Sequence, residues 1–234
     1  MGSTLDKLST GLVINGGPRP SSNVVDSLPN ADLIFAVDSG LDNALALGIT
    51  PDIVIGDLDS ISKQVLDFVD ENSIQLITYP QDKDSSDLEL CLAYAARSCS
   101  SVTIVDSGGG RMDHLFGLFA SMASNVTIPI SCNAFVSNSF VHVVRDHLTV
   151  KQTQNNLISI YPFGGDAKGV CLSGFRWDLT HETLSPNSTH GLSNELVSVS
   201  GEISLCLLYT SPSPRDQRGS GITAYGCKKK WGGG

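Results

Sequence analysis

The stretch that decides how this chain folds is residues 51–60, which read Pro-Asp-Ile-Val-Ile-Gly-Asp-Leu-Asp-Ser. Residues 53–55 form a short apolar run of the kind found in buried strands, and a glycine ends it. Asp57 and Asp59 stand two residues apart, so an extended backbone directs both carboxylates to one side. We therefore expect a buried strand with an acidic loop at its carboxyl end.

The same arrangement recurs on both sides of this stretch. Short apolar runs alternate with helix-compatible segments, which is typical of a mostly parallel α/β sheet. The expected strands are residues 12–14, 33–37, 53–55, 74–79 and 102–105, and the expected helices are residues 41–47, 63–69, 86–97 and 112–122. We predict that this α/β domain occupies residues 11–128.

The pattern changes after residue 128. Strand-like runs separated by glycine and asparagine turns predict a small all-β sandwich or barrel over residues 129–208. The expected strands there are residues 140–144, 157–161, 169–172 and 196–208. Residues 209–234 contain Ser-Pro-Ser-Pro, a lysine run and a closing glycine run, so we expect a disordered tail. That tail also resembles translated cloning-linker sequence.

Composition narrows the possible functions. The formal net charge of −9 argues against a nucleic-acid-binding protein, which usually has a basic face. No apolar run reaches the roughly 18 residues of a transmembrane helix, and the first residues do not resemble a signal peptide. The six cysteines are scattered without a CxxC pair, as in proteins that keep their thiols reduced. We expect a cytoplasmic protein that binds neither nucleic acid nor membrane.

Four polar clusters follow expected strands of the α/β half. They are residues 38–40 (Asp-Ser-Gly), 56–60 (Gly-Asp-Leu-Asp-Ser), 83–87 (Lys-Asp-Ser-Ser-Asp) and 108–114 (Gly-Gly-Gly-Arg-Met-Asp-His). Ligands of an open α/β sheet bind beyond the carboxyl ends of its strands, so these loops can converge. Carboxylate oxygens suit Mg²⁺, which binds through one or two carboxylates plus substrate phosphates. The candidate metal ligands are Asp57, Asp59, Asp84 and Asp87.

The glycine-rich cluster predicts a phosphate site. Its glycines let the backbone approach an anion, and the helix that follows presents its N-terminus to it. Arg111 has the side chain to hold phosphate oxygens in bidentate fashion. Two alternatives stay open: Ser86 and Glu89 fit a capping box with a purely structural role, and Lys83 is either a solvated lysine or a phosphate contact.

Taken in order, these motifs resemble those of the thiamine pyrophosphokinase family. The stretches that carry the resemblance are residues 38–40, 51–60, 83–89 and 109–114, and residues 174–179 and 191–195 in the β half. The resemblance implies an α/β nucleotide-binding domain followed by a β-sandwich. It also implies ATP and thiamine as substrates, Mg²⁺ as cofactor, and a homodimer with active sites between the subunits.

The resemblance also implies roles for single residues. Contacts to ATP phosphates and Mg²⁺ are expected from Asp38, Asp57, Asp59, Lys83, Asp84, Asp87, Gly109, Gly110, Arg111 and Asp113. Contacts to thiamine are expected from Asp87, Trp177, Ser193 and Asn194, although Trp177 also has an alternative interpretation as a core residue. The residues expected to be catalytic are Asp57, Asp59, Asp87 and Arg111, with Asp87 as the weakly assigned base.

The expected reaction is attack of the thiamine hydroxyl on the β-phosphorus of ATP, with AMP as leaving group. Three alternatives remain: a Mg²⁺-dependent hydrolase of nucleotides or phosphate esters, a pyrophosphokinase for another alcohol such as a pterin, and a non-catalytic nucleotide-binding module. Two departures from the family pattern stand out. Ser39 replaces a second glycine, and the last strands run into the tail, so we expect an edge strand to be missing or truncated.

Overall fold

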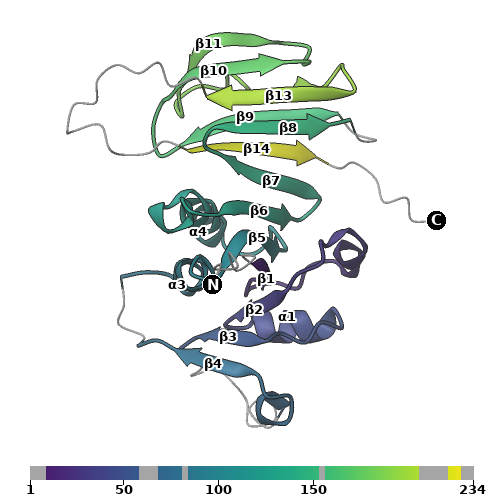
Figure 1. The fold of residues 1–234 in the computed structure, drawn as a ribbon, viewed down its shortest axis with the longest axis vertical. Coiled ribbons are helices and arrows are strands. Elements are labelled where there is room, and N and C mark those ends of the chain that lie inside the picture. Colours follow the sequence, from purple (N-terminus) through teal and green to yellow (C-terminus); the bar gives the residue numbers. More distant parts are fainter. Residues whose placement is uncertain (1–8, 58–67, 81–83, 153–155, 206–220, 228–234) are drawn as a thin grey trace, which may run out of the picture. The chain divides into compact units, whose positions relative to one another are not determined.

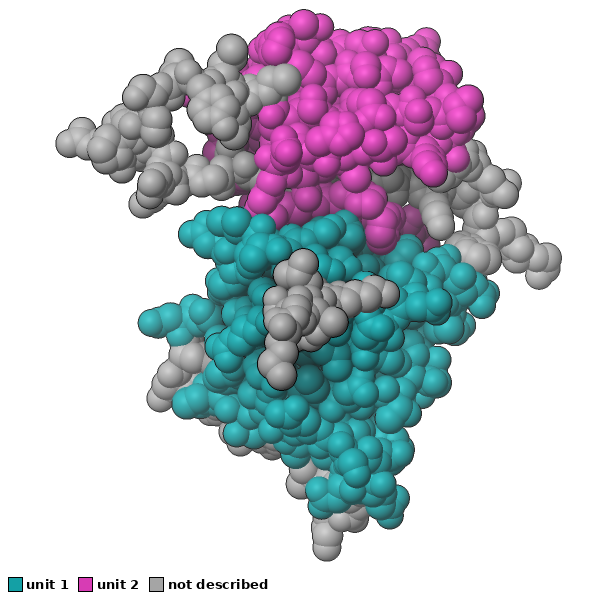
Figure 2. All heavy atoms as spheres, viewed as in Figure 1, with its two compact units in different colours: residues 1–137 teal, residues 138–234 magenta. Residues whose placement is uncertain are grey.

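The structure is a computed structural model that describes residues 9–57, 68–80, 84–152, 156–205 and, for the backbone, 221–227. It divides into two compact units, Met1–Ser137 and Asn138–Gly234 (Figure 2). Among the helices of the described residues, none has the length and apolarity needed to cross a bilayer.

Unit 1 is built on a parallel sheet in which the strand order is β6-β5-β1-β2-β3-β4 (Figure 1). Every pairing in it is parallel, which confirms the predicted mostly parallel α/β fold. In chain order the elements are β1 (Ser9–Ile14), η1 (Ser22–Ser27), β2 (Leu33–Val37), α1 (Gly40–Ala46), β3 (Ile53–Gly56), β4 (Gln75–Thr78), α3 (Asp87–Ala95), β5 (Cys99–Asp106), α4 (Met112–Ala123), η2 (Asn125–Thr127) and β6 (Ser131–Val136).

Burial explains why β2 and β3 contain no polar side chains. All four residues of β3 are buried, as expected for a strand covered on both faces of a parallel sheet. Helix α1 contributes to this cover: Leu41 belongs to the same apolar cluster as Val54, and Ala44 to the same cluster as Ile14. The two helix residues are three apart and therefore share one helix face.

Strand β6 lies in unit 1, although the expected domain boundary falls between residues 128 and 129. It pairs in parallel with β5 from Ser101 to Asp106, and this ladder ties it to the α/β sheet. Its sequence, Ser-Cys-Asn-Ala-Phe-Val, alternates polar and apolar residues in its first half, unlike the continuously apolar β2. The boundary between the two units therefore follows Ser137.

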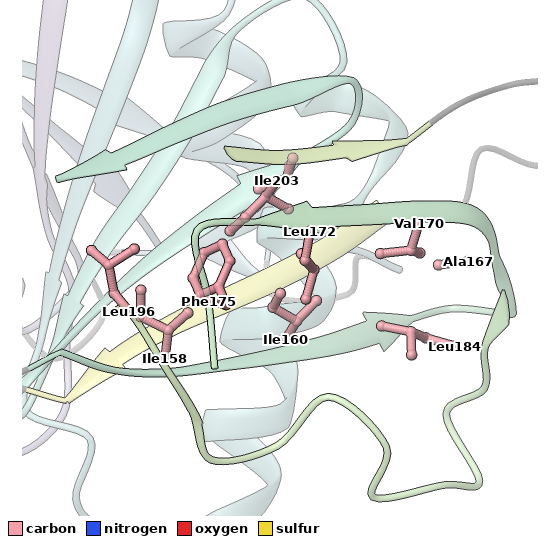
Figure 3. Close-up of a cluster of buried hydrophobic side chains, with 10 residues drawn as sticks. Ile158, Ile160, Ala167, Val170, Leu172, Phe175, Leu184, Leu196 and Ile203 are labelled. Atoms are coloured by element: carbon pink, nitrogen blue, oxygen red, sulfur yellow. The ribbon is translucent and has the colours of Figure 1, made fainter. Parts of the chain in front are cut away.

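Unit 2 consists of antiparallel strands in two groups, with the orders β12-β9-β14-β7 and β11-β10-β13-β8. The elements are β7 (Ser139–Val144), β8 (His147–Lys151), β9 (Leu157–Phe163), β10 (Ala167–Ser173), β11 (Leu179–Leu184), β12 (Asn194–Glu195), β13 (Ser200–Leu205) and β14 (Gly221–Cys227). One apolar cluster takes buried residues from both groups, among them Ile160 of β9, Leu172 of β10 and Ile203 of β13 (Figure 3). This shared core confirms the β-sandwich.

The expectation of a disordered tail over residues 209–234 is wrong for residues 221–227. These residues form β14, which pairs antiparallel with β7 on one side and with β9 on the other. Strand β14 thereby hydrogen-bonds the facing edges of both neighbours, which would otherwise expose backbone donors and acceptors. Strands β8 and β11 were not expected either, because their polar and exposed residues hide the strand pattern.

The cysteines that the structure describes with side chains are free, in line with the expected reduced thiols. Cys91, Cys99 and Cys132 are buried, and Cys171 is half-buried. Burial raises the pKa of the Cys91 and Cys99 thiols, which disfavours the reactive thiolate form.

The stability of the protein should fall as the pH is lowered from about 7 to about 4 because of His142. Its ring packs edge-on against Phe140 with centroids 4.5 Å apart, and burial lowers its pKa from 6.5 to about 4. The unfolded chain therefore takes up a proton in this range that the folded chain does not, so the free energy of unfolding should fall by about 2 kcal/mol between pH 7 and pH 5, and by about 3 kcal/mol by pH 4. Urea unfolding between pH 7 and pH 5 should show this loss, and His142→Gln should flatten it. The exposed His190→Gln serves as the control, and an unchanged slope in His142→Gln would contradict the assignment.

The pairing of β14 with two neighbouring strands predicts that a proline within it destabilises the protein. Thr223 pairs with Val143 and with Tyr161, so proline at this central position removes a backbone donor and does not fit the ladder. We expect Thr223→Pro to lower the free energy of unfolding by at least about 2 kcal/mol. The control, Thr223→Val, keeps the backbone N–H and the branched side chain. Equal urea midpoints for the two variants would show that β14 contributes nothing to the fold.

Candidate functional site

The parallel pairing of unit 1 places acidic residues that follow or end three strands at one edge of the sheet. Asp38 directly follows β2, Asp57 directly follows β3, and Asp106 is the last residue of β5. Because the strands run in the same direction, their carboxyl ends lie together, which is where open α/β sheets bind ligands.

Asp38 is held in an unusual backbone conformation at this edge. Its φ of 49° lies in the left-handed region, and its N–H donates to the carbonyl of Ile55 at 3.0 Å. Its carboxylate lies so close to Gly56 that a Cβ at position 56 would overlap Oδ1 of Asp38. A larger residue in place of this glycine of the Gly-Asp-x-Asp-Ser motif would therefore displace the Asp38 carboxylate from its present position.

The loop after β1 is tied to α1 through Asn43, which was not predicted, and to Ser39 just before the helix. Asn43 is buried, and its Nδ2 donates to the carbonyls of Asn15 at 3.1 Å and Gly17 at 3.2 Å. The N–H of Gly17 donates to Oγ of Ser39 at 3.1 Å. Serine at position 39 thus has a structural use in this chain. The Asn-Gly-Gly turn at residues 15–17 was the available signal for this loop.

The glycine-rich loop after β5 is organised by Asp106, which was also not predicted. Its Oδ2 accepts from Nδ2 of Asn15 at 2.6 Å, and its Oδ1 accepts from the N–H of Gly108 at 2.7 Å. The N–H of Gly109 donates to Oγ of Ser107 at 3.1 Å. Gly108 and Gly110 have φ of 68° and 85°, which favour glycine. The backbone N–H groups of Gly108 and Gly109, in the loop predicted to bind phosphate, therefore donate their hydrogen bonds to residues within the loop.

Arg111 and Asp113 form an exposed pair at the start of α4. Nε and Nη2 of Arg111 donate to the two carboxylate oxygens of Asp113, at 3.1 and 2.5 Å. The hydrogen bond and the charge of Asp113 raise the pKa of Arg111, and the hydrogen bond from Arg111 lowers the pKa of Asp113. A phosphate that uses this bidentate edge of the guanidinium must take the place of Asp113.

The described carboxylates offer oxygen donors of the kind that Mg²⁺ prefers. Asp57 and Asp87 are half-buried, and Asp84 is exposed. Asp87 opens α3, where Oγ of Ser86 accepts from the N–H of Glu89 at 3.2 Å, so the expected helix cap is confirmed. Within the residues that the structure describes, no group of three or more His, Cys, Asp or Glu could hold a metal ion. The predicted ligand Asp59 lies outside these residues, as does Lys83, and the metal site stays a prediction.

In unit 2, the three predicted thiamine contacts differ in exposure. The Trp177 side chain is 55% exposed, so its interpretation as a core residue is wrong. Asn194 is only 4% exposed and its amide is hydrogen-bonded to the Trp177 backbone. Ser193 is exposed, has a φ of 57°, and donates its N–H to Oγ of Ser159 at 3.0 Å.

Known protein families account for both units. A family model described as thiamin pyrophosphokinase, catalytic domain, matches residues 25–131, within unit 1. A second, described as thiamin pyrophosphokinase, vitamin B1 binding domain, matches residues 145–205, within unit 2. The chain belongs to the thiamine pyrophosphokinase family.

Individual members of the thiamine pyrophosphokinase family agree with this assignment. The thiamine pyrophosphokinase of Bacillus subtilis strain 168 is 28% identical over 199 residues, covering 82% of this chain and 92% of that protein. The crystal structure of thiamine pyrophosphokinase from Bacillus subtilis has a TM-score of 0.76 at 24% identity, covering 94% of this chain and 99% of that one. Thiamin pyrophosphokinase from Candida albicans has a TM-score of 0.74 at 11% identity, covering 95% and 90%. At these identities the structural matches support the fold.

The close approach of α1 to β1 predicts the effect of a single methyl group. A Cβ on Gly40 would overlap the carbonyl oxygen of Ile14, which is backbone and cannot rotate away. Gly40→Ala should therefore lower the free energy of unfolding by about 1–3 kcal/mol. Gly117→Ala is the matched control, since a Cβ there meets nothing within 4 Å and alanine favours the helix. Thermal unfolding should rank Gly40→Ala below the unmodified chain and Gly117→Ala at or above it; the reverse order would contradict the packing.

Proposed function

We infer that this chain catalyses thiamine pyrophosphorylation, with ATP as the donor and AMP as the product. The observation that carries this proposal is the set of acidic and glycine-rich loops at the carboxyl ends of β2, β3 and β5, in a chain of the thiamine pyrophosphokinase family. Loops at these strand ends are the usual ligand site of such a sheet.

The reaction requires positioning and charge neutralisation more than covalent chemistry from the protein. The oxygen of the thiamine hydroxyl forms a bond to the β-phosphorus, and the bond from that phosphorus to the oxygen it shares with the α-phosphate breaks. AMP leaves with that oxygen. The hydroxyl proton passes to a carboxylate, for which we propose Asp87, half-buried at the start of α3.

The residues of the proposed site fall into three groups, according to the ligand that each is proposed to contact. We propose that Mg²⁺ is held by Asp57, Asp59, Asp84 and Asp87, whose oxygens fit its preference; when bound, it neutralises phosphate charge. For the phosphates we propose Asp38, Lys83, Gly109, Gly110, Arg111 and Asp113, with Arg111 exchanging its Asp113 partner for phosphate oxygens. For thiamine we propose Trp177, Ser193 and Asn194, together with Asp87.

The remaining features of the proposal concern the assembly and its surroundings. We propose a homodimer with active sites between the subunits, in the cytoplasm, without a nucleic-acid or membrane partner. The net charge of −9 supports the absence of a nucleic-acid partner.

The first experiment incubates the purified chain with ATP and Mg²⁺, with and without thiamine, and quantifies AMP and thiamine diphosphate. We expect both products in equal amounts, only when thiamine is present, and no turnover after chelation by EDTA until Mg²⁺ is restored. Phosphate release without thiamine would instead indicate a hydrolase. Product formation only with another alcohol, such as a pterin, would indicate a different acceptor, and ATP binding without turnover a binding module.

The carboxylate assignment has its own test. Asp57→Asn keeps the size of the side chain and removes its charge, so kcat should fall by about 100-fold or more. Asp70→Asn makes the same change at an exposed position away from the strand ends and should leave kcat unchanged. Near-normal turnover by Asp57→Asn in the same assay would contradict the proposed role of this residue as a metal ligand.

A further inference from the structure

Trp177 combines an exposed side chain with a firmly held backbone. Its indole is 55% exposed, in the segment that links β10 to β11. That segment is pinned to residues 194–198: the N–H of Arg176 donates to the carbonyl of Glu195 at 2.8 Å, and the N–H of Val197 donates to the carbonyl of Gly174 at 3.1 Å. An exposed aromatic ring on a fixed backbone loses little conformational entropy when it binds a ligand.

Asn194 supplies the central part of this attachment. Its Nδ2 donates to the carbonyl of Trp177 at 2.8 Å, and its Oδ1 accepts from the N–H of Trp177 at 3.2 Å and of Glu195 at 2.8 Å. The amide is therefore directed at the backbone of Trp177 on both sides, and Asn194 is only 4% exposed. A side chain amide offers two donors and two acceptor sites, so both acceptor sites are used within the protein.

Arg176 covers one face of the indole and is itself paired with Glu195. The guanidinium of Arg176 lies 5.1 Å from the centroid of the Trp177 ring, and its Nη1 donates to Oε2 of Glu195 at 3.2 Å. A cation on one face of an indole is a favourable contact. It also leaves the opposite face as the surface on which a further ring can stack.

We propose that Asn194 is a positioning residue, which holds Trp177 as a one-sided platform for an aromatic ring of the acceptor and makes no substrate contact of its own. Arg176, which is paired with Glu195, completes this arrangement by covering the other face of the ring. The proposal rests on the proposed function in taking thiamine as the acceptor, and it reassigns Asn194 from the substrate contacts to the support of Trp177.

A double-mutant cycle distinguishes support from direct contact. Asn194→Asp keeps an acceptor for the two N–H groups but replaces the donor to the Trp177 carbonyl by a carboxylate oxygen. We expect it to raise KM for thiamine about tenfold and to change KM for ATP and kcat by no more than about twofold. In the Trp177→Ala background the same change should add nothing, because the platform it supports is gone. Asn187→Asp, at an exposed position of unit 2, is the matched control.

Fluorescence gives a readout that does not depend on turnover. The chain has two tryptophans, so Trp231→Phe leaves Trp177 as its single indole. In this background thiamine should quench the Trp177 emission, and Asn194→Asp should lower the anisotropy of that emission before any ligand is added.

If Asn194→Asp does not fold, Arg176→Gln tests the support of the Trp177 ring at the exposed surface. This variant should lower the anisotropy and should raise KM for thiamine only while Trp177 is present.

Two results would overturn the proposal. If the increases in KM from Asn194→Asp and Trp177→Ala multiply in the double variant, Asn194 contacts thiamine independently. If the anisotropy of Trp177 is the same with and without the intact amide, Asn194 does not position the indole. Failure of the proposed function appears separately, as an unmodified chain that forms no thiamine diphosphate, while the anisotropy still reports on Asn194.

Discussion

The parallel hydrogen bonding of β1, β2, β3 and β5 is the constraint on which the candidate site depends. It places the ends of these strands at one edge of the sheet, and with them Asp38, Asp57 and Asp106. No contact between the loops is needed to bring them together, because the strand register does so. The loops are then free to carry polar residues that a buried strand would exclude.

Close packing at this edge divides its polar residues into two groups. One group holds the loops: Asp106 and Asn43 use their side chains on neighbouring backbone and on Asn15. The other group, with Asp57 and Asp87, is half-buried at the ends of β3 and at the start of α3. A strand-end carboxylate is thus a structural or a functional candidate according to its neighbours, which sequence spacing does not reveal.

In unit 2, as in unit 1, one polar side chain holds the neighbouring backbone, and here that residue is Asn194. The core of unit 2, which is aliphatic except for Phe175, is shared by both groups of strands, and Trp177 and Asn194 lie outside this cluster, in the β10–β11 connection and at the start of β12. A buried asparagine must find partners for its amide, and Asn194 finds them in the backbone groups of Trp177 and the N–H of Glu195. The need to satisfy one buried polar group therefore fixes the position of an exposed aromatic ring.

Strands β1 to β5 and helices α1, α3 and α4 of unit 1, and the acidic residues directly after β2 and β3, were predictable from the chain because each depends on a local signal: an apolar run, a turn glycine, or the Ser86 cap. The antiparallel β half and the family were predictable for the same reason, through short motifs at fixed places. The roles of Asp106, Asn43 and Asn194 and the strand formed by residues 221–227 were not, since each depends on partners distant in the chain. Strand β14 exists because β7 and β9 present open edges to it, and Asn194 is a support because Trp177 lies beside it; neither partner is visible in the neighbouring sequence.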